Sequence, residues 1–470
     1  MNAVSWKDEV EKRQHCLIED TCRFLKIKSV LDETSISENA PFGEGIRQAL
    51  EFLLDKGHVD GFITKNVDGY AGHIEIGEGK ELVGILCHID VVPEGEGWTT
   101  PPYSADIRDN KIYARGALDN KGPAMAIYYA LKIIKELQLP LRKRIRMIIG
   151  TDEESSWKCV KHYFNQEEVP SMGFAPDAAF PIVHSEKGIC NFYFCQVHQY
   201  KGAENSLLQL IHFRAGARLN MVPDYAEALI QNGLYGDIGE IYREYISSHN
   251  LEGSLDVKDG HVLLKLRGVS AHGMEPETGK NAGLFLLKFL NTLPLDEKAM
   301  EFTEFTTKYL LRDSRGKALG ISHQNEEAGD LTINIGQMYY SQEKGGTIGA
   351  NLRYPITCDI DKTIANIKNF AHAMHFSVEN IENSFPHYVK KDANIIQVLQ
   401  RVYEEWTKQP AKLLSLGGAT YARSIPNGVA FGPSFPGDQE VAHQKDEYIE
   451  ISHLLKLTSI YVHAIYELAK

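Results

Sequence analysis

Short runs of aliphatic residues that end in polar side chains recur near the start of the chain. The clearest run, residues 81–90, reads Glu-Leu-Val-Gly-Ile-Leu-Cys-His-Ile-Asp. It lacks helical spacing and predicts a strand buried on both faces, as in a parallel α/β sheet. Because side chains alternate along a strand, His88 and Asp90 should leave on one face, and Cys87 and Ile89 on the other. The pattern therefore predicts an imidazole and a carboxylate at the carboxyl end of a strand, where open α/β sheets keep their sites.

Amphipathic helices and further strands surround this run. Apolar spacing predicts helices at residues 7–26, 44–56, 124–137, 393–407 and 450–469. Strands are predicted as a pair within 61–76, turning at Asp68-Gly69, and as buried runs at 144–149 and 428–431. Strands that alternate with helices in this way predict an α/β domain.

The middle of the chain has a different texture, in which several strands follow one another before helices intervene. This order is typical of an α+β module. We therefore expect a catalytic α/β/α domain with a mixed, largely parallel sheet, formed by residues 1–187 and 385–470. An inserted α+β lid domain, residues 188–384, should interrupt it, since surface loops tolerate insertions.

Composition narrows the class of protein. The net charge is -13, and acidic and basic residues are mixed along the chain, which disfavours nucleic acid and anionic membranes as partners. No apolar run approaches the ~20 residues of a spanning helix, and the amino terminus is charged, so we expect a cytoplasmic protein. The seven cysteines include no Cys-x-x-Cys pair, which indicates reduced thiols and no zinc finger.

Potential metal ligands follow the predicted strands or lie in loops: His88, Asp119, Glu154, Asp177 and His443. A site for two divalent ions about 3.5 to 4 Å apart needs nitrogen and oxygen donors on each ion and a shared carboxylate. These histidines and carboxylates satisfy that requirement. The neighbouring Glu153 is suited to take a proton from activated water and pass it to a leaving amine. Asp90 would hold the outer nitrogen of His88.

Each of these residues also has a structural interpretation. Thr151-x-x-Glu154 has the form of a capping box, and Asp119 has the position of a helix cap. Asp177 follows a proline, as turn residues often do, and His443 on its own would be a surface histidine. Only convergence of these side chains in space distinguishes the two interpretations.

Five ordered motifs carry a resemblance to a known family. They are Leu-Cys-His-Ile-Asp-Val-Val-Pro, Arg-Gly-Ala-Leu-Asp-Asn-Lys-Gly-Pro, Gly-Thr-Asp-Glu-Glu-Ser, Phe-Ala-Pro-Asp-Ala-Ala-Phe-Pro and Ala-His-Gln-Lys-Asp-Glu-Tyr-Ile. The chain resembles the bacterial PepV-type dipeptidases along essentially its whole length. These enzymes belong to the binuclear-zinc family that also holds aminoacylases, acetylornithine deacetylase and succinyl-diaminopimelate desuccinylase.

The resemblance implies a specific metal centre. Two zinc ions are expected per chain, with manganese or cobalt as alternatives. His88 and Asp177 would hold one ion, Glu154 and His443 the other, and Asp119 would bridge them. The resemblance also implies that Glu153 is the general base and that the peptide bond from Asp119 to Asn120 is cis.

The resemblance extends to the lid. Asn220 and His272 resemble residues that reach the scissile carbonyl, and Arg353 resembles the one that binds the free carboxylate. Arginine suits that role because its planar fork matches a carboxylate. Gly418, with Gly417, would present backbone N–H groups to the same carboxylate. The structural alternatives are a sheet-lining arginine, a histidine that caps the next helix and a glycine turn.

The implied activity is hydrolysis of unmodified dipeptides. Two alternatives stay open: an N-acyl amino-acid deacylase that uses the same metals, and a catalytically inactive binding protein. The presence of Glu153, the candidate general base, disfavours the inactive protein. The insertion is nearly double the length of the lids through which shorter family members dimerise. The resemblance therefore implies a monomer in which His272 acts in cis.

Overall fold

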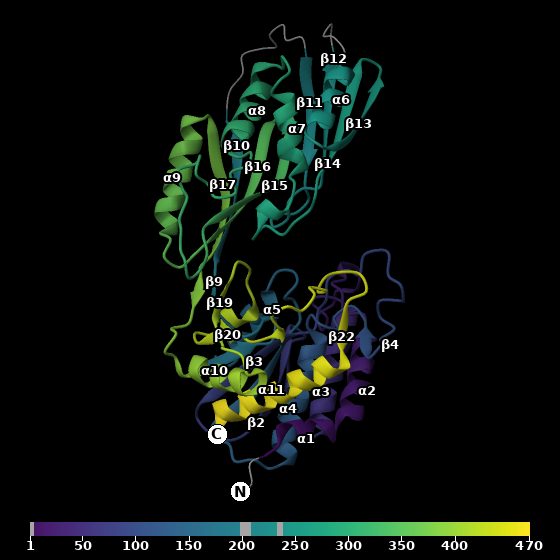
Figure 1. Cartoon of the computed structure of the whole chain (residues 1–470), viewed down its shortest axis with the longest axis vertical. Helices are drawn as coiled ribbons and strands as arrows, with labels where there is room; N and C mark the ends of the chain where they lie inside the picture. Colours follow the sequence, from purple (N-terminus) through teal and green to yellow (C-terminus); the bar gives the residue numbers. More distant parts are fainter. Residues whose placement is uncertain (1–3, 198–207, 233–237) are drawn as a thin grey trace. The chain divides into compact units, whose positions relative to one another are not determined.

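The computed structural model describes residues 4–197, 208–232 and 238–470 (Figure 1). The chain forms two compact units. Unit 1 comprises Met1–Ser185, Tyr388–Leu414 and Ala419–Lys470, and unit 2 comprises Glu186–His387 and Ser415–Gly418. Residues 415–418 therefore belong to unit 2, although the expected domain limits assign them to the second part of the catalytic domain.

Unit 1 is built on a nine-stranded mixed sheet in the order β1-β2-β6-β3-β7-β20-β9-β18, with β19 paired to β9. Its strands are β1 Ile63–Val67, β2 Ala71–Ile76, β3 Leu82–His88, β6 Arg144–Gly150, β7 Met172–Ala175, β9 Ile182–Glu186, β18 His387–Tyr388, β19 Leu413–Leu416 and β20 Gly428–Ala430. The central strands β6, β3, β7 and β20 are parallel to their neighbours in that series. The predicted α/β class with a mixed sheet is confirmed. The sheet is parallel in its centre, while β1, β2 and β9 pair in the antiparallel sense with their neighbours, so it is less parallel than the sequence led us to expect.

The predicted organising strand is β3, and every one of its residues is buried. It lies between β6 and β7, so both of its edges are hydrogen-bonded and both of its faces are covered. Cys87 and Ile89 belong to the apolar core, as the alternation rule requires, while His88 faces the ring of Tyr421 on the opposite side.

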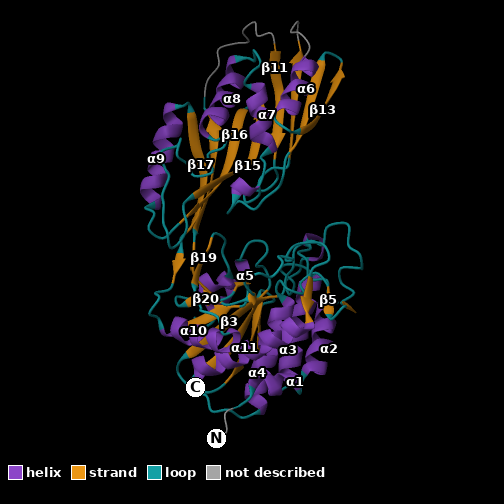
Figure 2. Cartoon of the chain, in the orientation of Figure 1, coloured by secondary structure: helices purple, strands orange, loops and turns teal. Residues whose placement is uncertain are grey.

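Helices cover the sheet of unit 1 (Figure 2). They are α1 Trp6–Glu11, α2 Gln14–Leu25, α3 Glu44–Val59, α4 Lys121–Glu136, α5 Lys158–Gln166, α10 Asn394–Thr407 and α11 Ile451–Ala469, with 3-10 turns η1 Glu33–Ser35 and η3 Tyr421–Ser424. Helices α3, α4 and α11 pack on the face that carries Ile74, Ile85 and Met147. The other face is covered by α5 and by η3, and Tyr421 lies against Gly150, where an added Cβ would sit 2.3 Å from the ring.

The prediction of a single opening helix over residues 7–26 is wrong, because the chain breaks into α1 and α2. Arg13 leaves helical backbone geometry, and its Nη1 atom donates to the Glu9 carbonyl at 2.7 Å. The break lets α1 pack against α11 while α2 packs against α4. Tertiary packing decides this boundary, since the apolar spacing alone runs through it.

Two small sheets bring distant loops together in unit 1. Strands β4 Asp106–Arg108, β5 Lys111–Tyr113 and β22 Tyr448–Glu450 form one, and β8 Ala178–Ala179 pairs with β21 Pro433–Ser434 in the other. Because β22 pairs with β5, the segment that precedes β22 lies beside the loop that follows β5.

Unit 2 has an eight-stranded sheet in the order β13-β14-β12-β11-β15-β16-β10-β17, with every pair antiparallel. The strands are β10 Gly188–Gln196, β11 Leu208–Ala215, β12 Tyr225–Asn232, β13 Glu252–Lys258, β14 His261–Arg267, β15 Thr332–Ser341, β16 Gly345–Tyr354 and β17 Phe376–Ser384. Its helices are α6 Ile238–Ser248, α7 Ala282–Leu290, α8 Glu297–Tyr309 and α9 Ile360–Ala373, with the 3-10 turn η2 Pro276–Thr278. Sheet and helices enclose a second apolar core, distinct from that of unit 1.

Truncation of a β3 side chain tests the central position of this strand. Ile85 is fully buried, and we expect Ile85→Ala to lower the free energy of unfolding by about 2–5 kcal/mol, because a cavity replaces buried methyl groups. Ile63 of β1, in the same sheet, is 62% exposed, so Ile63→Ala should change it by less than about 0.5 kcal/mol. Equilibrium denaturant titration of both variants gives the comparison, and equal losses would contradict the assignment.

Candidate active site

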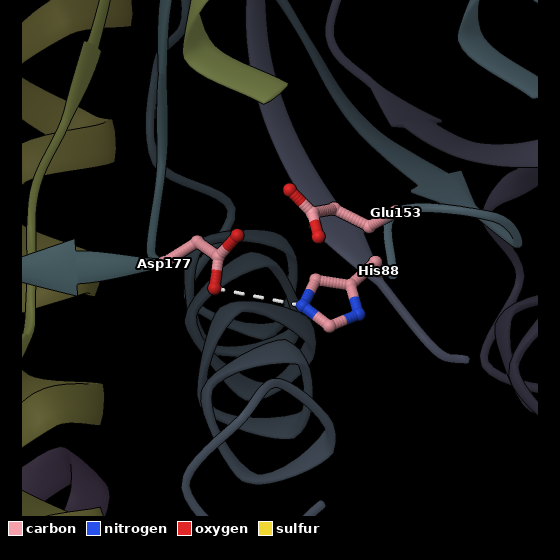
Figure 3. Close-up of side chains that lie close together, drawn as sticks. All are labelled: His88, Glu153 and Asp177. Carbon is pink, nitrogen blue, oxygen red and sulfur yellow. Dashed lines mark ion pairs between the residues drawn. The ribbon is translucent and has the colours of Figure 1, made fainter. Parts of the chain in front are cut away.

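The predicted ligands of unit 1 converge at one edge of its sheet. His88 is the last residue of β3, Glu153 and Glu154 follow β6, and Asp177 follows β7. Because β6, β3 and β7 are parallel neighbours, their carboxyl ends lie side by side. In Figure 3 the side chains of His88, Glu153 and Asp177 face one another across a small space.

Asp119 stands between the two histidines. Its Oδ1 lies 2.9 Å from Nε2 of His88, and its Oδ2 lies 2.9 Å from Nε2 of His443. The same His443 atom is 2.9 Å from a Glu154 oxygen, and Nε2 of His88 is 3.5 Å from an Asp177 oxygen. Each carboxylate oxygen of Asp119 therefore contacts a different histidine.

Two overlapping groups of side chains bring their donor atoms within 4.8 Å of one another: His88, Glu153 and Asp177, and His88, Asp119 and Glu154. Nitrogen and carboxylate oxygen are donors that zinc, manganese and cobalt accept. The edge of the sheet is therefore a candidate metal site. These two groups of side chains are not identical to the ligand sets that the resemblance implies. His88 belongs to both groups, and Glu153, which the resemblance makes the general base, belongs to one of them.

Three carboxyl groups of the cluster, those of Glu153, Glu154 and Asp177, resist ionisation. Burial raises the pKa of Glu153 well above its usual value, and the Asp177 carboxylate adds to the effect. Burial also raises the pKa of Asp177 to about 6, and it raises the pKa of Glu154 together with the charge of Asp119. Like charges held close in a poorly solvated place produce shifts of this kind, and a cation among them removes the repulsion.

The histidines and Asp119 shift in the opposite sense. Burial opposes protonation of His88, but Asp177 and Asp119 outweigh it and raise its pKa well above the usual value. For His443 the hydrogen bonds to Asp119 and Glu154 likewise outweigh burial, so that its pKa is about 11. Burial of Asp119 is outweighed by the same two histidines, which lower its pKa. Positive charge is thus favoured at Nε2 of both histidines, where a metal cation would bind in place of a proton.

Asp90 contacts His88 through both its backbone and its side chain. Nδ1 of His88 donates to the backbone carbonyl of Asp90 at 2.9 Å, and a carboxylate oxygen of Asp90 lies 3.5 Å from the same nitrogen. The carboxylate also accepts the backbone N–H groups of Glu153 at 3.1 Å and Glu154 at 3.0 Å. A carbonyl only accepts, so Nδ1 carries the proton and leaves Nε2 available toward the cluster.

The structural interpretations fail for two of the ligands. The Thr151 hydroxyl donates to the carbonyl of Tyr70, and the next helix begins only at Lys158, so Thr151-x-x-Glu154 is no capping box. Asn120, not Asp119, holds the N-cap position of α4, and it makes no side-chain cap. The peptide bond between Asp119 and Asn120 is cis, as the resemblance implies.

A buried ion pair that the sequence did not single out supports the cluster. Nη1 of Arg115 lies 2.7 Å from Oε2 of Glu447, and both side chains are essentially inaccessible to solvent. The Glu447 carboxylate also accepts the backbone N–H groups of Gly116 at 3.1 Å, Leu118 at 2.9 Å and Asp119 at 3.1 Å. It therefore fixes the backbone that carries Asp119.

Arg115 extends the same support to the second loop. Its guanidinium donates to the carbonyls of Gln444 at 3.2 Å and His443 at 3.3 Å. One ion pair thus ties the Asp119 loop to the His443 loop. Both charged residues lie within the motifs quoted above, but nothing in their spacing signals the pairing, which spans most of the chain.

In unit 2 the structure brings Asn220 and His272 together. Met221 and His272 form an isolated antiparallel bridge, and the N–H of Gly273 donates to the Asn220 carbonyl at 2.6 Å. The alternative role of His272 as a helix cap is excluded, because Asn281 caps α7 with its own side chain.

Arg353 is buried on β16 beside the glycine pair. Its Nε donates to the Asn351 side chain at 2.8 Å, and its Nη1 donates to the Gly417 carbonyl at 3.3 Å. Gly418, the next residue, is half-buried and belongs to unit 2. The Gly417–Gly418 turn therefore lies against Arg353 through a carbonyl.

The fold and the cluster define a class of protein, the metal-dependent hydrolases that carry their ligands on loops at the carboxyl edge of an α/β sheet. The model of peptidase family M20/M25/M40 matches residues 84–467. The chain belongs to this family and is a peptidase.

Relatives and solved structures agree with that assignment. "Putative dipeptidase YtjP" of Bacillus subtilis (strain 168) is 48% identical over 467 residues, covering 99% of this chain and 100% of that protein. A "Putative dipeptidase" of Staphylococcus epidermidis is 42% identical over 465 residues, covering 98% and 99%. Human carnosine dipeptidase 1 shares the fold, with a TM-score of 0.58 at 15% identity over 98% of each chain.

In the described part of the chain, no helix is both long and apolar enough to cross a membrane.

Removal of the Glu447 charge tests the buried ion pair. We expect Glu447→Gln to lower the free energy of unfolding by about 3–5 kcal/mol, because it leaves the Arg115 charge buried without its partner. Affinity for zinc or manganese should fall by about 10–100-fold, as for other groups that orient metal ligands. Denaturant titration and metal-binding calorimetry measure the two effects.

Glu450→Gln is the matched control. Glu450 is 48% exposed and faces Lys111 at 3.6 Å, so its loss should cost less than about 1 kcal/mol and leave metal affinity unchanged. Wild-type stability and metal affinity in Glu447→Gln would show that the ion pair does not organise the site.

Proposed function

We propose that the chain is a metal-dependent dipeptidase that hydrolyses unmodified dipeptides with a free carboxyl terminus. The observation that carries the proposal is the convergence of His88, Asp119, Glu154, Asp177 and His443 beside Glu153. The substrate class is supported by the dipeptidase names of relatives at 48% and 42% identity over nearly the whole chain.

The proposed cofactor is a pair of divalent ions, zinc with manganese or cobalt as alternatives. His88 and Asp177 would hold one and Glu154 and His443 the other, with Asp119 shared. The position of Asp119, with one oxygen toward each histidine, supports the shared role. Such ions, when bound, polarise a peptide carbonyl and make water more acidic.

Glu153 is proposed as the general base. Burial and the nearby Asp177 charge raise its pKa, which brings a carboxylate closer to the working pH and makes it a better proton carrier. It would take a proton from the attacking water and deliver it to the nitrogen of the leaving amine. Asp90 holds the backbone N–H groups of Glu153 and Glu154 and so acts as a positioning residue.

Unit 2 is proposed to supply the substrate contacts. Arg353 would bind the free carboxylate together with backbone N–H groups at Gly418. Asn220 and His272 would donate to the carbonyl oxygen as it gains charge, a contribution that is typically worth on the order of 10²- to 10³-fold in rate for one donor. The hydrogen bond from Gly273 to the Asn220 carbonyl supports a common role for these two residues. We further propose that His272 acts within its own chain, in a monomer.

A substrate panel tests the proposal. Purified protein, stripped with a chelator and reloaded with zinc, manganese or cobalt, is assayed on Leu-Leu, β-alanyl-histidine, Leu-Leu amide and N-acetyl-leucine, with metal content measured in parallel. We expect two ions per chain and fastest hydrolysis of the free dipeptides. Faster cleavage of N-acetyl-leucine would indicate a deacylase, and no cleavage of any substrate by loaded protein would indicate a binding protein.

Substitution of Glu153 tests the mechanism. Glu153→Gln keeps the shape but cannot take a proton, so kcat should fall by about 10²- to 10⁴-fold while metal content is retained. Glu78, which is exposed on the same unit, provides the control Glu78→Gln, with kcat unchanged. Full turnover by metal-loaded Glu153→Gln would rule out the assigned role.

A further inference from the structure

Unit 2 contains a cavity of about 310 Å³ that none of the roles above uses. It is lined by the start of α7, the η2 turn, the segment after α8 and the first residues of β15. Its floor is apolar and made of buried side chains: Val222, Leu284, Leu310, Ile333 and Ile335. The volume lies at the lower end of the range for small-molecule sites, about 300–1,000 Å³.

The acidic side chains at the cavity already have partners. Glu277 forms an ion pair with Arg315. The Asp313 carboxylate accepts the backbone N–H groups of Lys317 at 3.0 Å and Ala318 at 2.7 Å. Both carboxylates are therefore already engaged within the protein.

The basic side chains at the cavity are those of Lys280 and Arg312. Nζ of Lys280 donates to the carbonyl of Asn250 at 2.7 Å and lies 5.8 Å from the Phe285 ring centroid. The Arg312 guanidinium is also 5.8 Å from that ring. Within the ranges that the structure describes, neither Lys280 nor Arg312 forms an ion pair with a carboxylate. Two cations thus flank an aromatic ring at the mouth of an apolar cavity.

This arrangement selects a ligand that is apolar at one end and anionic at the other. The guanidinium of Arg312 offers paired donors to a carboxylate, and Lys280 adds a second positive charge. The buried aliphatic floor favours a hydrocarbon tail, because covering apolar surface removes it from water. We propose that this cavity is a second binding site, for a small apolar carboxylate.

The site adjoins the segments that carry Asn220 and His272. Val269 and Lys280 are joined by two backbone hydrogen bonds of 2.9 and 2.8 Å, which close the loop that bears His272. Asn334, also at the cavity, donates its side-chain amide to the carbonyls on either side of Asn220, at 2.7 and 3.0 Å. A ligand in the cavity would therefore contact the loop of residues 269–280, and it would also contact Asn334, which holds the turn that carries Asn220.

Titration of the metal-loaded, full-length protein with 4-methylpentanoate tests the proposal. We expect saturable binding with a dissociation constant on the order of 1 mM, as for other ligands of this size, and no binding of the neutral 4-methylpentanamide. Arg312→Glu and Lys280→Glu should each weaken binding at least about tenfold, because a charge-assisted contact becomes a repulsion. Lys368→Glu on α9, an exposed site remote in sequence, is the matched control and should bind as wild type.

Two further measurements locate the ligand. Arg353→Ala should retain binding, and hydrogen exchange of residues 269–280 should slow on saturation in wild type but not in Arg312→Glu. Replacement of 4-methylpentanoate by L-leucine shows whether an amino acid or only a carboxylate without an amine occupies the site.

Absence of saturable binding would overturn the proposal. So would binding that Arg353→Ala abolishes and Arg312→Glu retains, or saturation that leaves exchange of 269–280 unchanged. None of these outcomes depends on dipeptidase activity, since each is read without turnover.

Discussion

Repulsion among carboxylates at the carboxyl edge of β3, β6 and β7 is the constraint around which unit 1 is organised. Like charges in a poorly solvated place repel one another strongly. Without support from the surrounding structure, the loops would therefore move apart the side chains of Asp119, Glu153, Glu154 and Asp177. Hydrogen bonds from backbone N–H groups to buried carboxylates hold the loops of Asp119, Glu153 and Glu154 in place. A bound cation would therefore relieve the repulsion among these carboxylates.

Two further carboxylates hold the ligand loops in place without belonging to the cluster. Asp90 accepts the N–H groups of Glu153 and Glu154, and Glu447 accepts those of the loop that ends in Asp119. Each is a buried carboxylate whose oxygens accept hydrogen bonds from backbone N–H groups, and these bonds fix the geometry of the loop. Removal of either would free a ligand loop without touching a ligand.

Unit 2 uses neutral polar groups for a similar purpose. Asn334 and Asn351 are direct partners in the register of β15 and β16. The first holds the carbonyls around Asn220, and the second accepts from Arg353. Amides inside a sheet serve well here, because each has donors and an acceptor that can be satisfied without burying a charge.

The sequence by itself determined the elements with strong local patterns and the identity of the candidate ligands. The buried run at β3, the turn at Asp68-Gly69 and the helices α3 and α11 follow from periodicity and turn chemistry, which act over a few residues. The placement of His88 opposite Cys87 follows from strand alternation. Only the tertiary structure decided what depends on contacts between distant segments. These features are the break between α1 and α2, the pairing of Arg115 with Glu447, and the hydrogen bonds of the Asp90 carboxylate to the backbone N–H groups of Glu153 and Glu154. Such contacts join residues tens to hundreds of positions apart, and no local pattern in a single chain records which of them meet.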